Sequence, residues 1–479
     1  MNPPRVTTPG RAPVGGQTSA ATFGTVWRRV ARPDLPTTKK VLAIAWPVVL
    51  TNLLQSLALT VDLIMVASQG TIKQAAMGIA TQLFMVGMTL ATGLAAGATA
   101  LVARGWGAGD QAESDRSTSA AVLVAIALSI PLVAITYFFD GPLLRAMTVG
   151  QSGADFDAIV ANGGLVLHVL AWGILGYMVM TVATGAMQGA GDTKPALWIG
   201  IGVNVVNLGL DWVLIYGHLG APALGLAGAA IATAASYTFG GAVFVAILFA
   251  GRRPVRLRAR AGRLLDTSRR VLRVGGPAFA EQLLLNVGFL AYLLLIVHFG
   301  PASLAAHQIG LRIQSFAFMP GFGFAAAASA LVGQGLGRGS PEEAETNGWV
   351  STAMGLAIMV ALSIPMFLFA RPLAGLFTSD PDALALSITW IHVLVFAMPA
   401  IAFHFTVAGA LRGAGDTRWP LLVSFLGLWL VRLPVAWYLA DVRGWLMYGI
   451  WAGYVIEYYL RAAITTWRFS QGKWKTLKV

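Results

Sequence analysis

Two aspartates lie inside long apolar stretches of the sequence. Asp62 follows Leu57-Ala-Leu-Thr-Val61, and Asp211 lies in the block 196–217, four residues after Asn207 and so on the same helix face. An ionisable residue inside a membrane span is costly and is a functional candidate by default. Its carboxyl group can take up a proton or bind a cation such as Na⁺. The alternative is an acid that only caps a helix end or reaches the membrane surface, and it is stronger for Asp211, which lies closer to the outer end.

Glu281 is a third acid inside an apolar stretch, one helical turn beyond Pro277. Two interpretations are open. The side chain could bind substrate or an ion, or it could form a structural ion pair with Arg312 or Arg432.

Histidine is the other side chain that can carry protons here. His307 and Gln308 lie near the start of the apolar block 303–334. His307 can act as a proton carrier, whereas a histidine in such a place more commonly fixes helix packing through a hydrogen bond. We expect three others to be core residues: His168, His392 and His404.

These residues must be positioned by membrane-spanning helices, because the composition excludes most other classes. Hydrophobic residues make up 57% of the 479 residues and charged residues 11%, against about 25% charged in a soluble domain. Cysteine is absent, which excludes disulfides, Fe–S clusters and cysteine–zinc sites. Twelve apolar blocks are each long enough to cross a bilayer, and they predict an all-α integral membrane protein: 41–68, 77–103, 118–139, 162–187, 196–217, 222–250, 270–298, 303–334, 347–370, 384–411, 418–440 and 445–467.

Basic residues gather in three segments that share one side of a twelve-span topology, namely 1–40, 251–269 and 468–479. Positive residues favour the cytoplasmic side, so both termini are predicted to be cytoplasmic in a multi-pass protein of the cell (inner) membrane. The net charge of +13 is then an orientation signal and not a sign of nucleic-acid binding. We predict a disordered basic tail at 1–40, a basic linker at 251–269 and a basic tail at 468–479.

The two halves of the chain are related by an internal repeat. At an offset of 230 residues, Pro47 matches Pro277. At an offset of 224, Gly185-Ala-Met-Gln-Gly-Ala-Gly-Asp-Thr193 matches Gly409-Ala-Leu-Arg-Gly-Ala-Gly-Asp-Thr417 at seven of nine positions. So many identities in so short a segment indicate a real duplication.

The repeat predicts two six-helix lobes, 41–250 and 270–467. Six is an even number of spans, so both halves enter the membrane from the same side and are expected to pack around a pseudo-twofold axis along the membrane normal. A cavity between two such lobes, with rocking of the lobes to alternate access, is typical of a transporter.

The membrane acids break the symmetry of this repeat. The repeat partner of Asp62 is Tyr292, and that of Asp211 is Val435. A structural duty shared by both lobes does not predict this difference, which favours a functional role in the first lobe.

The two matched turns are predicted to be structural. Asp192-Thr193 and Asp416-Thr417 can cap the helices that follow. The turns lack the full glycine pattern and the Lys-Ser/Thr end of a phosphate-binding loop, so ATP binding is not expected, and no cofactor or resident metal is expected either. Glu457 and Arg461 stand four residues apart, which predicts an ion pair near the cytoplasmic end of the last span.

Taken in order, these features resemble the multidrug and toxic compound extrusion (MATE) family over nearly the whole chain after residue 40. The resemblance rests on the first block with Pro47 and Asp62, the two Gly-Ala-Gly-Asp-Thr turns, Asn207-Leu-Gly-Leu-Asp211 and Ala305-Ala-His-Gln-Ile309. It implies two lobes of six helices with a V-shaped central cleft. It also implies secondary export of drugs, commonly organic cations, driven by inward flow of H⁺ or Na⁺.

The resemblance also implies roles for individual residues. Asp62 and Asp211 match acids of a proton- or cation-responsive cluster in the first lobe. Asn207 matches an Asn of that cluster, and Thr233 matches a Thr of the sixth helix. In the fourth helix, where the family often has another Asn, this sequence has Thr184.

Within the family, this chain is similar to the DNA-damage-inducible-type, proton-coupled branch. Sodium-coupled members combine an acid equivalent to Glu281 with an acid in the tenth helix. The corresponding stretch here, Pro399-Ala-Ile-Ala-Phe-His-Phe-Thr-Val-Ala408, contains no carboxylate.

We therefore predict a non-enzymatic antiporter that works as a monomer in the bilayer and exports small, cationic, amphipathic drugs in exchange for H⁺. Na⁺ at Asp62 and Asp211 is the alternative ion. A lipid-linked or polysaccharide flippase of the same superfamily is the alternative function. It is expected to line its cleft with basic residues, for which Arg312 and Arg432 are the candidates. An intramembrane enzyme would need paired acids with a histidine near one membrane face, and no such cluster stands out.

Overall fold

The computed structural model describes residues 35–67, 69–147, 153–251, 253–258 and 264–477. Eleven helices in these segments are long and apolar enough to cross a membrane. The twelfth long helix, α16 (Met447–Ser470), has 24 residues and carries three charged side chains on its buried face. The described segments contain helices and no strand, which confirms the predicted all-α class.

The first lobe has six long helices that follow the first six predicted spans: α2 (Leu35–Ala67), α3 (Thr71–Gly107), α4 (Gln111–Phe138), α6 (Ala154–Gly189), α7 (Lys194–Tyr216) and α8 (Leu226–Ala250). Two short elements connect them: α5 (Asp140–Met147) and the 3₁₀ turn η1 (His218–Gly220). The helix α2 begins before the predicted start at residue 41, so it takes in the end of the segment predicted as a disordered tail. Residues 1–34 of that tail lie outside the described residues.

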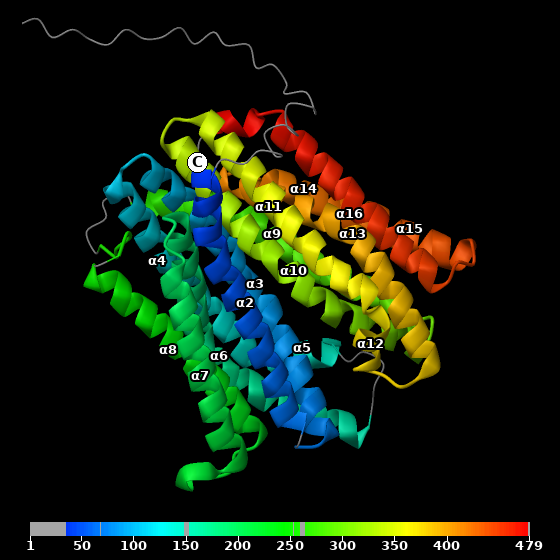
Figure 1. The fold of residues 1–479 in the computed structure, drawn as a ribbon. Coiled ribbons are helices and arrows are strands. Elements are labelled where there is room, and N and C mark those ends of the chain that lie inside the picture. Colours follow the sequence, from blue (N-terminus) through cyan, green and yellow to red (C-terminus); the bar gives the residue numbers. More distant parts are fainter. Residues whose placement is uncertain (1–34, 68, 148–152, 252, 259–263, 478–479) are drawn as a thin grey trace, which may run out of the picture.

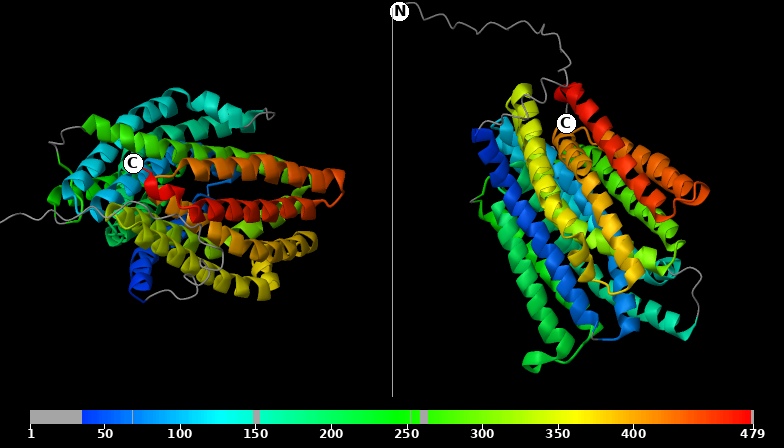
Figure 2. Two further views of the ribbon diagram at one scale, coloured as in Figure 1. Left: turned by 90° about the horizontal axis from the view of Figure 1, so that it is seen from above. Right: turned by 45° about the vertical axis from the view of Figure 1, so that its right-hand side comes forward.

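The second lobe repeats this arrangement and packs beside the first (Figures 1 and 2). Its long helices, besides α16, are α9 (Leu264–Val297), α10 (Pro301–Gly337), α11 (Pro341–Leu368) and α13 (Pro381–Gly413). The eleventh span is built from four consecutive pieces: α14 (Arg418–Phe425), the π-helical segment η2 (Leu426–Arg432), α15 (Leu433–Trp437) and the π-helical segment η3 (Tyr438–Val442). Two short elements complete it: α12 (Ala370–Gly375) and the 3₁₀ turn η4 (Lys473–Thr476).

The sequence repeat is visible in the helix packing. Gly185 of α6 lies against Ala95 of α3, so closely that a Cβ on the glycine would be 2.6 Å from the Ala95 carbonyl oxygen. The repeat partner, Gly409 of α13, lies in the same way against Ala325 of α10, which is the repeat partner of Ala95. Small residues allow the close approach of helix backbones that drives packing in membranes. The same contact therefore organises both lobes.

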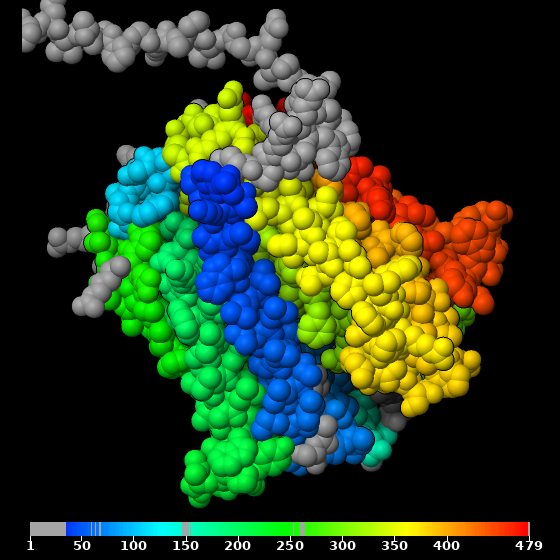
Figure 3. All heavy atoms as spheres, viewed as in Figure 1, coloured from blue at the N-terminus to red at the C-terminus, as the bar shows by residue number. Residues whose placement is uncertain are grey.

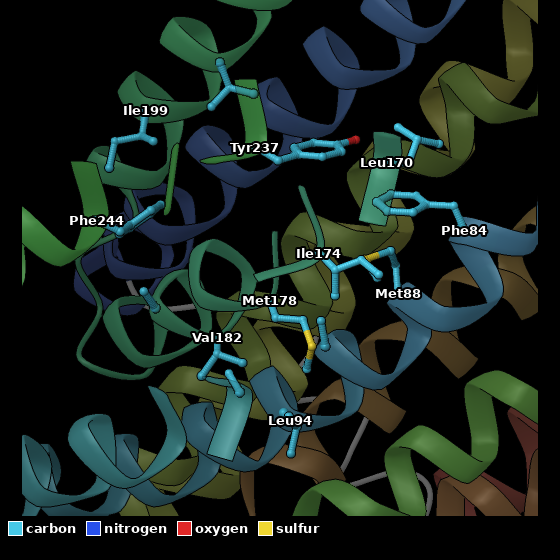
Figure 4. Packing of buried hydrophobic residues seen from close by; sticks show 14 of the residues in the cluster. Phe84, Met88, Leu94, Leu170, Ile174, Met178, Val182, Ile199, Tyr237 and Phe244 are labelled. Carbon is cyan, nitrogen blue, oxygen red and sulfur yellow. The ribbon is translucent and has the colours of Figure 1, made fainter. Parts of the chain in front are cut away.

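Each lobe has its own apolar core. The first is built around side chains of α3, α6 and α8 such as Phe84, Met178 and Tyr237 (Figure 4). In the second, Trp390 and Trp451 stack with ring centroids 5.1 Å apart. Each lobe is therefore packed largely around its own set of apolar side chains.

The lobes join at the end of the bundle that carries the described chain ends, Leu35 and Leu477, and we call this the closed end. The helix α2 runs along the seam between the lobes (Figure 3). Its first turns form a shared core with α10 and α11, made by Val41, Ile44, Ala45, Phe324, Ala327, Ala330, Leu331 and Val350.

Arg104 of α3 ties the two lobes together at the closed end. Its Nη1 donates to the Leu477 carbonyl oxygen at 2.7 Å, and its Nη2 donates to the Ala414 carbonyl oxygen at 2.8 Å. Nearby, Gln334 Nε2 of α10 donates to the Gly189 carbonyl oxygen at 2.9 Å. Hydrogen bonds from a charged donor contribute about 1.5–3 kcal/mol each, so these contacts favour closure.

Replacing Arg104 with Ala should populate a conformation in which the closed end is open. The native chain has no cysteine, so cysteines placed at Ala108 and Glu342 can carry two spin labels, one on each lobe. We expect a second, longer distance population in Arg104→Ala. Arg116→Ala is the control, because Arg116 pairs with Glu113 of its own helix at 3.0 Å. Distance distributions that match in Arg104→Ala and the parent would contradict the proposed closure.

The helix caps predicted at the two matched turns are wrong. The Thr193 hydroxyl donates to the Ile44 carbonyl oxygen of α2 at 3.2 Å, and neither Thr193 nor Thr417 makes a capping hydrogen bond. Asp416 accepts from Arg468 Nη2 at 2.8 Å, and Asp192 lies 3.3 Å from an Arg253 nitrogen. The partners of these groups come from other parts of the chain: the backbone of α2, the connector after α8 and the side chain of Arg468 in α16.

The histidines divide into two kinds. His404 is buried, as predicted. His168 and His392 are half-buried, so their assignment to the core is wrong. Each ring contacts the last turn of a neighbouring helix. His168 Nε2 lies 3.1 Å from the Tyr137 carbonyl oxygen of α4, and His392 Nε2 lies 3.3 Å from the Phe367 carbonyl oxygen of α11. Carbonyl groups in the last turn of a helix lack helical partners, and these two repeat-related histidines supply one.

Candidate functional site

A cavity of about 470 Å³ lies inside the first lobe. Residues of α2, α3, α6, α7 and α8 line it. Asp62 is the single charged side chain among the described residues of the lining. A pocket of this size, mostly apolar with a few polar groups, is typical of a small-molecule site.

Asp62 of α2 lies in the lining of this cavity, and Asp211 of α7 is buried close to it. The two carboxyl groups are close enough to interact electrostatically, and Asn207 Nδ2 donates to Asp211 Oδ2 at 3.1 Å. Asp211 is 1% exposed. Two carboxylates this close repel each other unless they share a proton or a cation lies between them. The pair can therefore hold one proton or one monovalent cation, and the capping alternative does not describe Asp211.

Thr184 and Thr233 also line the cavity. The Thr184 hydroxyl donates to the Met180 carbonyl oxygen at 2.8 Å, and the Thr233 hydroxyl donates to the Ala229 carbonyl oxygen at 3.0 Å. Each hydroxyl thus binds its own helix. They contribute polar surface to the cavity and are not hydrogen-bonded to the acid pair in this structure.

Four cavity residues were missed by reasoning from the sequence. They are amides that offer both donors and acceptors to a ligand: Asn52, Gln55, Gln82 and Asn204. A signal was available for two of them. Gln55 precedes Asp62 by two helical turns and shares its face, and Asn204 lies one turn before Asn207.

Three of the aromatic rings that line the cavity contact one another. Phe84 and Tyr237 stack with ring centroids 6.2 Å apart (Figure 4). Tyr177 meets Tyr237 edge-on with ring centroids 4.9 Å apart. Aromatic faces attract organic cations. Met85 and Met180 add flexible, polarisable surface. Together with one carboxylate pair, this surface suits amphipathic cations of varied shape.

Glu281 has a different partner from either arginine predicted for it. It binds Arg412 of α13 at 2.9 Å, and the Ser424 hydroxyl donates to its Oε1 at 2.9 Å. The predicted pairings with Arg312 and Arg432 are wrong, because α13 and not α10 presents an arginine to this face of α9. Glu281 is 1% exposed. Its charge is neutralised within the second lobe, which favours the structural interpretation.

The remaining second-lobe candidates do not gather into a site. His307 is buried and stacks on Trp390 with ring centroids 5.4 Å apart, so it packs between helices. Gln308 and Arg312 are exposed. Glu457 and Arg461 form the predicted ion pair, although it lies fully buried in the middle of α16 and not near its end. Across the described residues, no group of three His, Asp or Glu side chains is placed to bind a metal ion.

Comparison with known sequences gives matches along the length of the chain. The MatE family model matches residues 47–213 and 277–438, one segment in each lobe. A probable multidrug resistance protein NorM of Bradyrhizobium diazoefficiens is 33% identical over 437 residues, which cover 89% of this chain and 92% of the relative. The probable NorM of Thermotoga maritima is 28% identical over 440 residues, covering 91% and 93%.

Comparison with solved structures shows the same fold. A crystal structure of MATE in the bent conformation superposes with a TM-score of 0.83 at 23% identity, covering 94% of this chain and 98% of the other. A structure of MATE in the straight conformation superposes with a TM-score of 0.82 at 24% identity, covering 93% and 98%.

Proposed function

Because this chain belongs to the MatE family of membrane transporters, we propose that it is a proton-coupled antiporter that exports amphipathic organic cations. The observation that carries the proposal is the Asp62–Asp211 pair at the wall of an aromatic-lined cavity. The two relatives named above carry the name probable multidrug resistance protein NorM. Members of such a family move their substrates and do not transform them.

Exchange follows because protons and the cationic substrate compete for the negative charge of the Asp62–Asp211 pair. With the pair deprotonated, the cavity attracts a cationic substrate. One proton shared by the pair leaves a single negative charge that still attracts the cation, and uptake of a second proton neutralises the pair and releases the substrate. The lining has no basic residue among those the structure describes, so an anionic lipid headgroup has no partner here. This disfavours the flippase alternative.

Protons suit this chain better than Na⁺. A sodium site in the second lobe needs at least one free carboxylate, and Glu281 is held by Arg412 and Ser424. The first-lobe pair accepts a shared proton without further ligands, whereas Na⁺ needs several oxygen ligands around it. We therefore assign the chain to the proton-coupled, DNA-damage-inducible-type branch.

The closed end is proposed to face the cytoplasm. Described basic residues gather there, including Arg253, Arg258, Arg270 and Lys475, and cytoplasmic ends of membrane proteins are rich in Lys and Arg. Both termini are then cytoplasmic, and the structure is an outward-facing state. Because the repeat places both lobes in one chain, a monomer is sufficient for alternating access.

Transport in proteoliposomes tests the coupling directly. Vesicles loaded with ethidium receive either an acidic exterior or a high external Na⁺ concentration, with valinomycin and K⁺ clamping the membrane potential. We expect the pH gradient to drive ethidium efflux and the Na⁺ gradient at uniform pH to leave it at the leak rate. Efflux driven by Na⁺ alone would overturn the proton assignment, and efflux driven by neither gradient would overturn antiport.

A further inference from the structure

Arg432 lies in the interior of the second lobe, although a charged side chain is costly there. It is 1% exposed. Four aromatic rings surround its guanidinium carbon, with centroids 4.4 Å away for Tyr454, 5.2 Å for Tyr292, 5.3 Å for Tyr458 and 5.5 Å for Phe289. Its Nε and Nη1 have no hydrogen-bond acceptor among the described residues. Ring faces therefore provide most of the surroundings of this cation.

One carboxylate completes these surroundings. Glu457, which is fully buried, accepts from Arg432 Nη2 at 2.6 Å, and its other oxygen pairs with Arg461. The π-helical segment η2 ends at Arg432. Gly427 in the same segment makes room for the pair, because a Cβ there would lie 2.6 Å from Arg461 Nε and 3.1 Å from Glu457 Oε1. The π-helical segment η2 and the glycine at position 427 thus leave the space that the side chains of Arg432, Glu457 and Arg461 occupy.

The place that Arg432 occupies corresponds to the cavity of the first lobe. Tyr292, whose ring faces the guanidinium, is the repeat partner of Asp62. Gln314, which donates to the Tyr454 hydroxyl at 2.8 Å, is the repeat partner of Phe84. Asp62 and Phe84 both line the first-lobe cavity.

The last helix of each lobe gives the same correspondence. Gly228 of α8 packs against the backbone of Leu214, and Gly449 of α16 packs in the same way against the backbone of Ala440. Pairing these two glycines pairs Tyr237 with Tyr458. Tyr237 lines the first-lobe cavity, and Tyr458 faces Arg432.

We infer that the second lobe contains a cation-binding cage at the position equivalent to the first-lobe cavity, and that Arg432 fills it as a covalently attached occupant. Tyrosine faces with one carboxylate form a site for guanidinium or small alkylammonium ions. In the first lobe the site is open and its cation exchanges. In the second lobe the cation is part of the chain, so that lobe does not exchange ions. The inference does not depend on which ion drives the first lobe.

Removing the attached cation should open the cage to a free one. The test uses the full-length Arg432→Ala protein in detergent, with thermal unfolding followed by tryptophan fluorescence, since Trp390 lies 5.2 Å from Tyr454 between ring centroids. Guanidinium chloride is titrated to about 20 mM against equal NaCl and equal urea. We expect a saturable rise of a few degrees in the Tm of Arg432→Ala with guanidinium alone, because a ligand that binds the folded state stabilises it by mass action.

Two matched proteins show whether the response belongs to the cage. The parent and Arg312→Ala, which loses an exposed arginine of the same lobe, should show no rise. Arg432→Ala/Glu457→Gln keeps the rings and lacks the carboxylate, and it should respond much less. A folded Arg432→Ala with no guanidinium-specific rise, or an equal rise in the double variant, overturns the proposal.

The test also covers a variant that does not fold in ordinary buffer. Expression and purification of Arg432→Ala with about 10 mM guanidinium throughout should then restore monodisperse protein. A ligand present above its Kd for the folded state stabilises that state. Failure of guanidinium to restore folding counts against the cage. Neither outcome of this test bears on the antiport proposed for the first lobe, so the two proposals can fail separately.

Discussion

Asp62→Asn should reduce ethidium export driven by a pH gradient to the leak rate of protein-free vesicles, while the variant folds normally. Asparagine has nearly the shape of aspartate but cannot exchange a proton, and it removes the only charge in the described cavity lining. Asp62→Asn therefore loses both proton uptake at residue 62 and the negative charge that attracts the cationic substrate. The same vesicles should bind ethidium more weakly at neutral pH, which equilibrium dialysis measures.

Asp382→Asn is the control, because Asp382 is an exposed acid in the first turn of α13. It should transport at the parent rate. Asp211→Asn should fail in the same way as Asp62→Asn, since the two carboxyl groups share one proton or cation. Full proton-driven export by Asp62→Asn would show that the pair is structural and that the protons travel elsewhere.

Glu457→Ala should be the most destabilising single substitution in the second lobe. Glu457 is the carboxylate partner of both Arg432 and Arg461, and all three side chains are buried. Removing one partner of a buried ion pair costs about 3–5 kcal/mol, because the remaining charge is left uncompensated. Here two guanidinium groups lose their partner at once. Thermal unfolding in detergent should show a much lower Tm than the parent.

Glu343→Ala is the matched control for this loss. Glu343 pairs with Arg338 at 2.8 Å, and both side chains are partly exposed. Exposed pairs contribute about 0–1 kcal/mol, so its Tm should stay close to that of the parent. Equal losses in the two variants would mean that the buried group does not stabilise the second lobe.

The twelve spans, the two lobes and the key acids could be predicted from the sequence. Spans are predictable because hydropathy over a window of bilayer length is a local property. The duplication is visible because the turns at 185–193 and 409–417 still match. Asp62 and Asp211 stood out because a carboxylate between apolar residues is rare, and the structure brings the two together.

The partners of buried charges could not be predicted in the same way. Glu281 binds Arg412, from which 131 positions separate it in the chain, and the sequence offered Arg312 and Arg432 as equally reasonable partners. Which arginine reaches Glu281 depends on how α9, α13 and the eleventh span rotate against each other. The capping residues of the two turns were mispredicted for the same reason, since their partners come from distant helices.

From the sequence we could predict a duplicated membrane protein of twelve spans whose first lobe alone has acids at the positions of Asp62 and Asp211, because hydropathy and the repeat can be read along the chain. What lies at the two positions that the repeat relates could be seen only in the folded protein. One is an open cavity beside a carboxyl pair, and the other is closed around Arg432. The difference depends on which side chains the packed helices turn inward, and that is a property of contacts between residues far apart in sequence.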